Sequence, residues 1–170
     1  MMKLLGGAAT AAALVFGAAT PSAAQTQVLG TDVAACAPGA AGPAALVRVS
    51  GLKDREGRLR LQYYSDDPKT FLASGAFIRR QEVPMTPYGD MVLCITVPAP
   101  GAYAFVVLHD RDEDGKLSIW SDGVGFSNNI KLALAKPKLA PILYTVGPGV
   151  TPIHIIMNYR RGLSVRPLAQ

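Results

Sequence analysis

Residues 57–64 read Gly57-Arg-Leu-Arg-Leu-Gln-Tyr-Tyr64, and apolar and polar side chains alternate along them. The apolar positions share one side of an extended chain: Leu59, Leu61 and Tyr63. The polar positions share the other side: Arg58, Arg60 and Gln62. Alternation with a period of two predicts a β-strand with one face in a core and the other face toward solvent. The preceding polar run, residues 53–57, ends in glycine as hairpin loops do.

Further strand-like stretches occur across the rest of the chain, separated by proline and glycine turns. They cover residues 44–50, 76–83, 91–97, 101–109, 141–146 and 151–159. In the last stretch, Ile153, Ile155 and Met157 share one face. A short helical turn fits residues 68–72, but no long helical period occurs. Strands at this spacing predict an all-β fold, an antiparallel β-sandwich of about seven strands over residues 44–160.

One turn adds a more specific fold signal. The segment Pro98-Ala-Pro-Gly101 leads into the strand at residues 101–109, and Tyr103 lies near the start of that strand. A tyrosine in this position can return its hydroxyl to the turn, an arrangement that recurs in immunoglobulin-like sandwiches. We therefore expect Tyr103 to hold this corner.

The first residues predict an export signal. Met1-Met-Lys3 is a short basic start, residues 4–20 form an uncharged apolar run, and residues 21–24 are small. This pattern predicts a signal peptide over residues 1–24 with cleavage before Gln25. The alternative, a membrane anchor, is disfavoured because the run is short and only weakly apolar. No second stretch of spanning length follows, so we expect a periplasmic or secreted chain without a transmembrane segment.

The two cysteines, Cys36 and Cys94, predict one disulfide, because an even pair in an oxidising compartment most simply pairs. It would tie an N-terminal segment, residues 25–43, to a strand. Residues 33–36 also resemble a lipoprotein processing box, but such a box should directly follow the apolar run. Residues 161–170 form a tail without a clear pattern.

Charge is unevenly distributed. The formal net charge of +5 falls to +4 when Lys3 is removed with the signal, and five of the twelve acids lie within residues 110–122. Basic residues form pairs elsewhere: Arg58 with Arg60, Arg79 with Arg80 and Arg160 with Arg161. A mild basic excess on an exported chain points to anionic lipid or cell-wall polymer before nucleic acid, but a solvated face is the favoured explanation.

The acidic loop that follows the strand at residues 101–109 resembles the first half of a calcium loop. Asp110, Asp112 and Asp114 occupy the first, third and fifth positions, and Gly115 occupies the sixth. The carbonyl of Lys116 and the hydroxyl of Ser118 would serve the seventh and ninth. Ser121 stands where a bidentate glutamate should close the loop, and Asp122 follows one residue late.

Three interpretations of this loop compete. The first is a weak calcium site formed by the loop acids with Lys116, Ser118 and Asp122. Oxygen ligands favour calcium over zinc. The second is a metal-free turn in which carboxylates accept hydrogen bonds from backbone amides. The third is a catalytic acid cluster.

The segment after the loop, residues 120–129, is rich in glycine and amides and holds the only tryptophan. Trp120, Phe126 and Asn128, together with His109 beside the loop, are candidates to contact a ligand. The alternative is that the aromatic residues close the end of the sandwich and the asparagines satisfy turn amides. No nucleophile elbow, zinc motif or phosphate loop occurs, so enzyme activity has little support.

The combined pattern resembles a known bacterial family. Gly101-Ala-Tyr-Ala104, His109-Asp110, Asp114-Gly-Lys116 and Gly125-Phe-Ser-Asn128 occur in an order that is similar to the exported family called domain of unknown function 2141. The resemblance covers roughly residues 46–159. It implies an immunoglobulin-like or prealbumin-like sandwich outside the cytoplasm, and it implies no established activity.

These observations predict an exported binding or envelope-associated structural module that carries a weak calcium site and has an unknown envelope component or small ligand as partner. An alternative is a small periplasmic hydrolase or carbohydrate-processing enzyme that uses loop carboxylates. A third is a purely structural domain whose acidic loop binds nothing.

Overall fold

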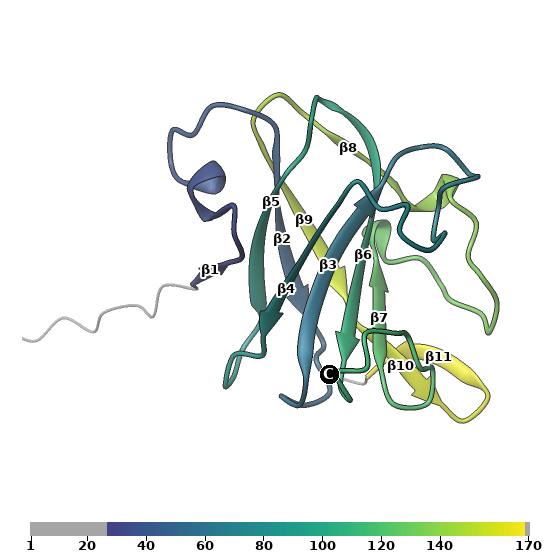
Figure 1. Cartoon of the computed structure of the whole chain (residues 1–170). Coiled ribbons are helices and arrows are strands. Elements are labelled where there is room, and N and C mark those ends of the chain that lie inside the picture. The colour runs from purple at the N-terminus through teal and green to yellow at the C-terminus, as the bar shows by residue number, and fades with distance from the viewer. Residues whose placement is uncertain (1–26, 169–170) are drawn as a thin grey trace, which may run out of the picture.

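Two β-sheets stand face to face in the computed structural model, which describes residues 27–168 (Figure 1). The smaller sheet has the order β1 (Val28–Leu29), β5 (Met91–Thr96), β2 (Ala44–Ser50) and β9 (Val150–Ile156). The larger sheet has the order β11 (Ser164–Pro167), β10 (Asn158–Arg161), β7 (Gly123–Phe126), β6 (Gly101–Asp110), β3 (Arg58–Tyr64) and β4 (Arg79–Pro84), and β8 (Leu143–Val146) also pairs with β6. The predicted all-β sandwich is therefore confirmed.

Three short 3-10 helices complete the described elements: η1 (Val33–Cys36), η2 (Ser127–Asn129) and η3 (Ala140–Ile142). None of the helices in residues 27–168 has the length and apolar character that crossing a membrane requires. The predicted signal peptide, residues 1–24, falls outside the described residues.

The core between the sheets follows from the alternation along β3. Leu59, Leu61 and Tyr63 are buried against the smaller sheet, as predicted. Val47 of β2 and Ile155 of β9 meet them from the opposite side. Burying each such side chain stabilises the fold by roughly 1.5–3 kcal/mol.

The corner at Tyr103 also forms as predicted. Its hydroxyl donates a hydrogen bond to the carbonyl of Ala99 at 2.8 Å. The ring packs edge-on to Tyr63, with ring centroids 5.3 Å apart, so the corner is joined directly to the core.

The N-terminal segment is held by several contacts besides the confirmed disulfide between Cys36 and Cys94. The Cα atoms of these two cysteines are 5.9 Å apart. β1 pairs in parallel with β5, and the carboxylate of Asp32 accepts hydrogen bonds from the backbone N–H and hydroxyl of Thr96 at 2.8 and 2.9 Å. The segment thus becomes an edge of the smaller sheet.

The sandwich differs from the sequence expectation in its connections. β2 pairs in parallel with β9 over seven residue pairs, whereas we expected antiparallel strands throughout. The predicted strand at residues 151–159 is divided at Met157, so that β9 belongs to the smaller sheet and β10 to the larger. This change of sheet joins the two layers by a continuous segment of chain.

Three strands lie where we expected none: β1 in the N-terminal segment, β7 and β11. β7 was predicted as part of a loop, because its sequence Gly-Val-Gly-Phe looks like a turn. A Cβ atom on Gly123 would overlap the ring of Tyr159, so close packing by β10 requires glycine there. β11 lies within the tail that showed no pattern, and it pairs with β10 over residues 164–167.

Candidate metal centre

The acidic loop leaves the larger sheet at the end of β6 and returns at the start of β7. β6 and β7 are antiparallel, and His109 is the register partner of Gly123. Asp110 directly follows His109, and Asp122 directly precedes Gly123. The hairpin register therefore sets these two carboxylates opposite each other at the mouth of the loop.

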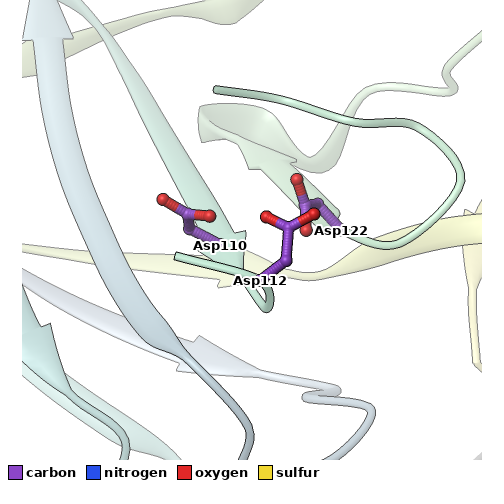
Figure 2. A group of neighbouring side chains, drawn as sticks. All are labelled: Asp110, Asp112 and Asp122. Carbon is purple, nitrogen blue, oxygen red and sulfur yellow. The ribbon is translucent and has the colours of Figure 1, made fainter. Parts of the chain in front are cut away.

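Figure 2 shows the carboxylates of Asp110, Asp112 and Asp122 gathered on one side of the loop. One oxygen from each lies within 4.8 Å of the others, a spacing that could hold a metal ion. Asp110 and Asp122 are buried, with 3% and 4% exposure, while Asp112 is exposed. Asp122 lies one residue after the position where a calcium loop has a bidentate glutamate, and it supplies the third carboxylate of the group.

Backbone amides of the loop fix two of these carboxylates. Gly115 donates its N–H to Oδ2 of Asp110 at 3.0 Å. Ser118 donates its N–H to Oδ2 of Asp122 at 2.8 Å, and Arg111 donates its N–H to Oδ1 at 3.1 Å. The loop therefore folds around its own acids, which is the behaviour expected of both a calcium loop and a metal-free turn.

Asp110 is the carboxylate whose surroundings bear most on the two interpretations. Its Oδ1 atom is buried and has no hydrogen-bond partner among the described residues. Burial raises the pKa of this carboxyl group above 3.8, and the charges of Asp122 and Asp114 raise it further. The hydrogen bond from the Gly115 N–H and the charge of Arg60 lower it. Leaving a buried charged oxygen unpaired costs free energy that a bound cation would recover.

Within residues 27–168, Arg60 is the one cationic side chain that pairs with Asp110. Its Nη2 lies 3.4 Å from Oδ2 of Asp110, and its Nη1 donates to the carbonyl of Gly115 at 2.9 Å. We expected Arg60 to face solvent, but it is only 6% exposed because the acidic loop folds over it. Its charge is shared with Glu82, 2.7 Å away, so it offsets only part of the negative charge.

The remaining predicted ligands are arranged differently. Asp114 is exposed, and its carboxylate accepts the N–H of Lys116 at 2.7 Å, so it is not in the group of three. The hydroxyl of Ser121 lies 3.3 Å from Asp112 and 3.1 Å from Asp122, and it links them. Participation of the Lys116 carbonyl and the Ser118 hydroxyl stays a prediction.

His109 does not face the loop acids. Its ring is fully buried on the other side of β6. Nε2 lies 2.8 Å from the carbonyl oxygen of Glu56, which can only accept, so Nε2 carries the proton. Nδ1 then accepts from the hydroxyl of Tyr159 at 2.7 Å, and that hydroxyl accepts the N–H of Lys53 at 3.1 Å.

Burial is the main cause that lowers the pKa of His109 below 6.5, whereas the hydrogen bond to the Glu56 carbonyl and the charge of Asp54 raise it; the lowered pKa favours the neutral ring at pH 7. This network joins the turn at residues 53–57 to β6 and β10. His109 therefore acts as a structural residue in this geometry, and no surface is available through which it could contact a ligand.

The candidate ligand residues after the loop divide into two kinds. Phe126 is buried in a second apolar cluster, and Asn128 donates to the carbonyls of Pro141 and Leu143 at 3.0 and 2.9 Å. These contacts match the structural interpretation, and contact of Phe126 or Asn128 with a ligand stays a prediction. Trp120 is 75% exposed and so does not close the sandwich; its ring lies 3.2 Å from Cζ of Arg160.

A family model whose description is "uncharacterized protein conserved in bacteria" matches residues 47–154, more than half of the chain. The chain belongs to the DUF2141 family. The resemblance seen in the sequence is thereby confirmed. The match includes Asp110, Asp112 and Asp122 and the whole hairpin that carries them. No curated protein and no solved structure matches the chain.

Proposed function

We propose that this DUF2141 protein is an exported binding module whose acidic loop takes a calcium-type cation at Asp110, Asp112 and Asp122. The observation that carries the proposal is the buried, unpartnered Oδ1 of Asp110 beside two further carboxylates. A metal-free turn accounts for the amides that Asp110 and Asp122 accept, but it leaves this oxygen without a partner. A cation would satisfy it directly.

The ligand chemistry favours calcium. The group offers only oxygen atoms, which suit calcium or magnesium rather than zinc. Two ligands are buried and one is on an exposed turn, an arrangement that suits the flexible coordination of calcium better than the strict octahedron of magnesium. With so few protein carboxylates, we expect a dissociation constant on the order of 10⁻⁴ to 10⁻³ M, as in extracellular modules.

The disulfide supports export, because such bonds persist in oxidising compartments. A periplasmic or secreted location remains part of this proposal. The hydrolase alternative gains no support from residues 27–168, because the histidine nearest the acids is buried and both its ring nitrogens are engaged.

Thermal unfolding of the chain without its predicted signal, residues 25–170, tests the cation site. A ligand that binds only the folded state stabilises it by RT ln(1 + [L]/Kd). For a Kd of about 1 mM, about 10 mM calcium should add about 1.4 kcal/mol, or roughly 4 °C in Tm. EDTA should abolish the rise and magnesium should produce a smaller one.

Two variants make the test specific. Asp110→Asn removes the unpartnered charge and should abolish the calcium-dependent rise. Asp114→Asn is the matched control, because this acid lies in the same loop but outside the group of three. The proposed site would be contradicted if calcium did not raise the Tm of the wild type, or if it still raised the Tm of Asp110→Asn.

A further inference from the structure

A hollow of about 580 Å³ lies on the outer face of the larger sheet. Val107 of β6 is in the core between the sheets, so its neighbours Val106 and Leu108 point to the opposite face, where they line the hollow. The volume is within the range of about 300–1,000 Å³ that is usual for small-molecule sites.

The floor of the hollow is apolar, and strand register explains why. Leu108 is the partner of Val124, and Val106 is the partner of Phe126, so β6 and β7 present four adjacent apolar side chains. Asn158 of β10 continues this row toward the sheet edge, where Arg160 follows two residues later on the same face.

Exposed apolar side chains gather around this floor. Leu117 and Ile119 of the acidic loop are 49% and 42% exposed, and Leu134, from the segment between η2 and η3, is 52% exposed. All three line the hollow. Large apolar side chains grouped around one concavity are typical of a surface that contacts a ligand or partner.

The charged residues of the hollow are mainly basic. Arg80, Lys136 and Arg160 line it, and none of them forms an ion pair within the described part of the chain. Arg60 also lines it but is paired with Glu82 and Asp110. The acidic member is Asp122, whose two oxygens already accept hydrogen bonds from the loop.

Arg160 provides the most specific feature. Its Nε donates to the carbonyl of Gly162 at 2.8 Å, and its guanidinium lies on the ring of Trp120. Nη1 is buried and has no hydrogen-bond partner among residues 27–168. A buried guanidinium donor without a partner is costly, and a carboxylate is the group that its planar geometry matches best.

We propose that this hollow binds a medium-chain fatty carboxylate, with its hydrocarbon chain over Val106, Leu108 and Val124 and its carboxylate at Arg160. The apolar floor favours the chain, and the unpaired basic residues favour the negative head. The proposal names a ligand for the binding module proposed above, but it does not require the cation.

Titration calorimetry with three probes of equal chain length tests the proposal: octanoate, 1-octanol and octyltrimethylammonium. We expect saturable one-to-one binding that is tightest for octanoate and weakest for the cation. Octanoate should also change the fluorescence of Trp120, the only tryptophan, because the carboxylate competes for Arg160. All titrations are made both in EDTA and in calcium, so a failure of the cation site leaves this result readable.

Two variants locate the binding. Arg160→Met should weaken octanoate binding about tenfold or more while changing 1-octanol binding less than about twofold, because only octanoate loses a hydrogen bond between charged groups. Val124→Phe adds a ring to a partly exposed position in the floor, and it should weaken octanoate and 1-octanol alike by filling the hollow.

Four binding results would overturn the proposal. They are the absence of saturable binding for all three probes, equal affinity for octanoate and 1-octanol, tightest binding of octyltrimethylammonium, and unchanged octanoate binding in both variants. A chain that dimerises in light scattering and becomes monomeric with Val124→Phe would assign the hollow to a second copy, and so would also overturn it.

Discussion

Asp110 is the residue on which the chemistry of the loop depends. It is the last residue of β6, so the strand fixes its backbone, while burial under the loop removes its carboxylate from water. Because burial raises the pKa of this carboxyl group above 3.8, the folded chain holds a proton there more tightly than the unfolded chain. Ionised Asp110 therefore destabilises the metal-free fold.

This sign gives a pH prediction. Between pH 3.8 and the raised pKa, ionisation of Asp110 should lower the free energy of unfolding as the pH rises, and above that pKa the loss is complete. Calcium binds the ionised form, so the stabilisation by calcium should be small near pH 4 and should grow toward pH 7. Denaturant unfolding with calcium and with EDTA at each pH measures the difference.

Asp32 and Asp54 have lowered pKa values, but their effects should cancel between the calcium and EDTA series, because neither is in the carboxylate group. Asp110→Asn should give a difference near zero at every pH. A stabilisation by calcium that is as large near pH 4 as at pH 7 would contradict the role given to Asp110.

At the scale of elements, the hairpin of β6 and β7 brings the acids of the candidate site together. The acids at residues 110, 112 and 114 could be recognised from their spacing, and so could the strand before them. The position of Asp122 depends on β7. This strand was not predicted from the sequence, because two of its four residues are glycine. Those glycines make room for Tyr159 and Ile155, contacts that no local pattern reveals.

The turn at residues 53–57 supports the same hairpin from the neighbouring strand. Gly57 has φ of +70°, and a Cβ atom there would overlap the carbonyl oxygen of Asp110 and lie 2.6 Å from Cα of Arg111. Only glycine allows both the backbone conformation and this close approach. The start of the acidic loop is therefore held against the turn.

Gly57→Ala should lower the free energy of unfolding by more than about 2 kcal/mol, because left-handed strain of about 1–3 kcal/mol is added to the overlap with Asp110. Urea unfolding measures the change. Gly149→Ala is the matched control, since a Cβ atom there meets nothing within 4 Å, and it should change stability by less than about 0.5 kcal/mol. Equal effects of the two substitutions would show that the turn does not support the loop as described.

At the scale of the whole molecule, the two faces of the larger sheet have different roles. The inner face joins the smaller sheet in the core, and the disulfide fastens the N-terminal segment to β5 of that sheet. The outer face carries the hollow, and the loop that holds the three carboxylates forms one wall of it. The proposed cation site and the hollow thus share Asp122.

Much of this architecture could be predicted from the sequence, because alternation in β3 and the turn before Tyr103 are local signals of a sandwich. The disulfide could also be predicted from the pair of cysteines, and the acidic loop could be recognised from the spacing of its acids. The parallel pairing of β2 with β9 could not be predicted, since it joins segments about a hundred residues apart. The hollow could not be predicted either, because its lining comes from six strands and three connecting segments.

The central claim, that the loop binds a calcium-type cation, is tested most directly by terbium luminescence. Terbium replaces calcium at oxygen sites, and Trp120, two residues before Asp122 and the only tryptophan in the chain, can transfer its excitation to a nearby ion. We predict a luminescence signal that saturates at one terbium per chain, is displaced by millimolar calcium, persists in Asp114→Asn and is lost in Asp110→Asn. A wild-type chain without calcium-displaceable luminescence, or an Asp110→Asn chain that retains it, would contradict the claim.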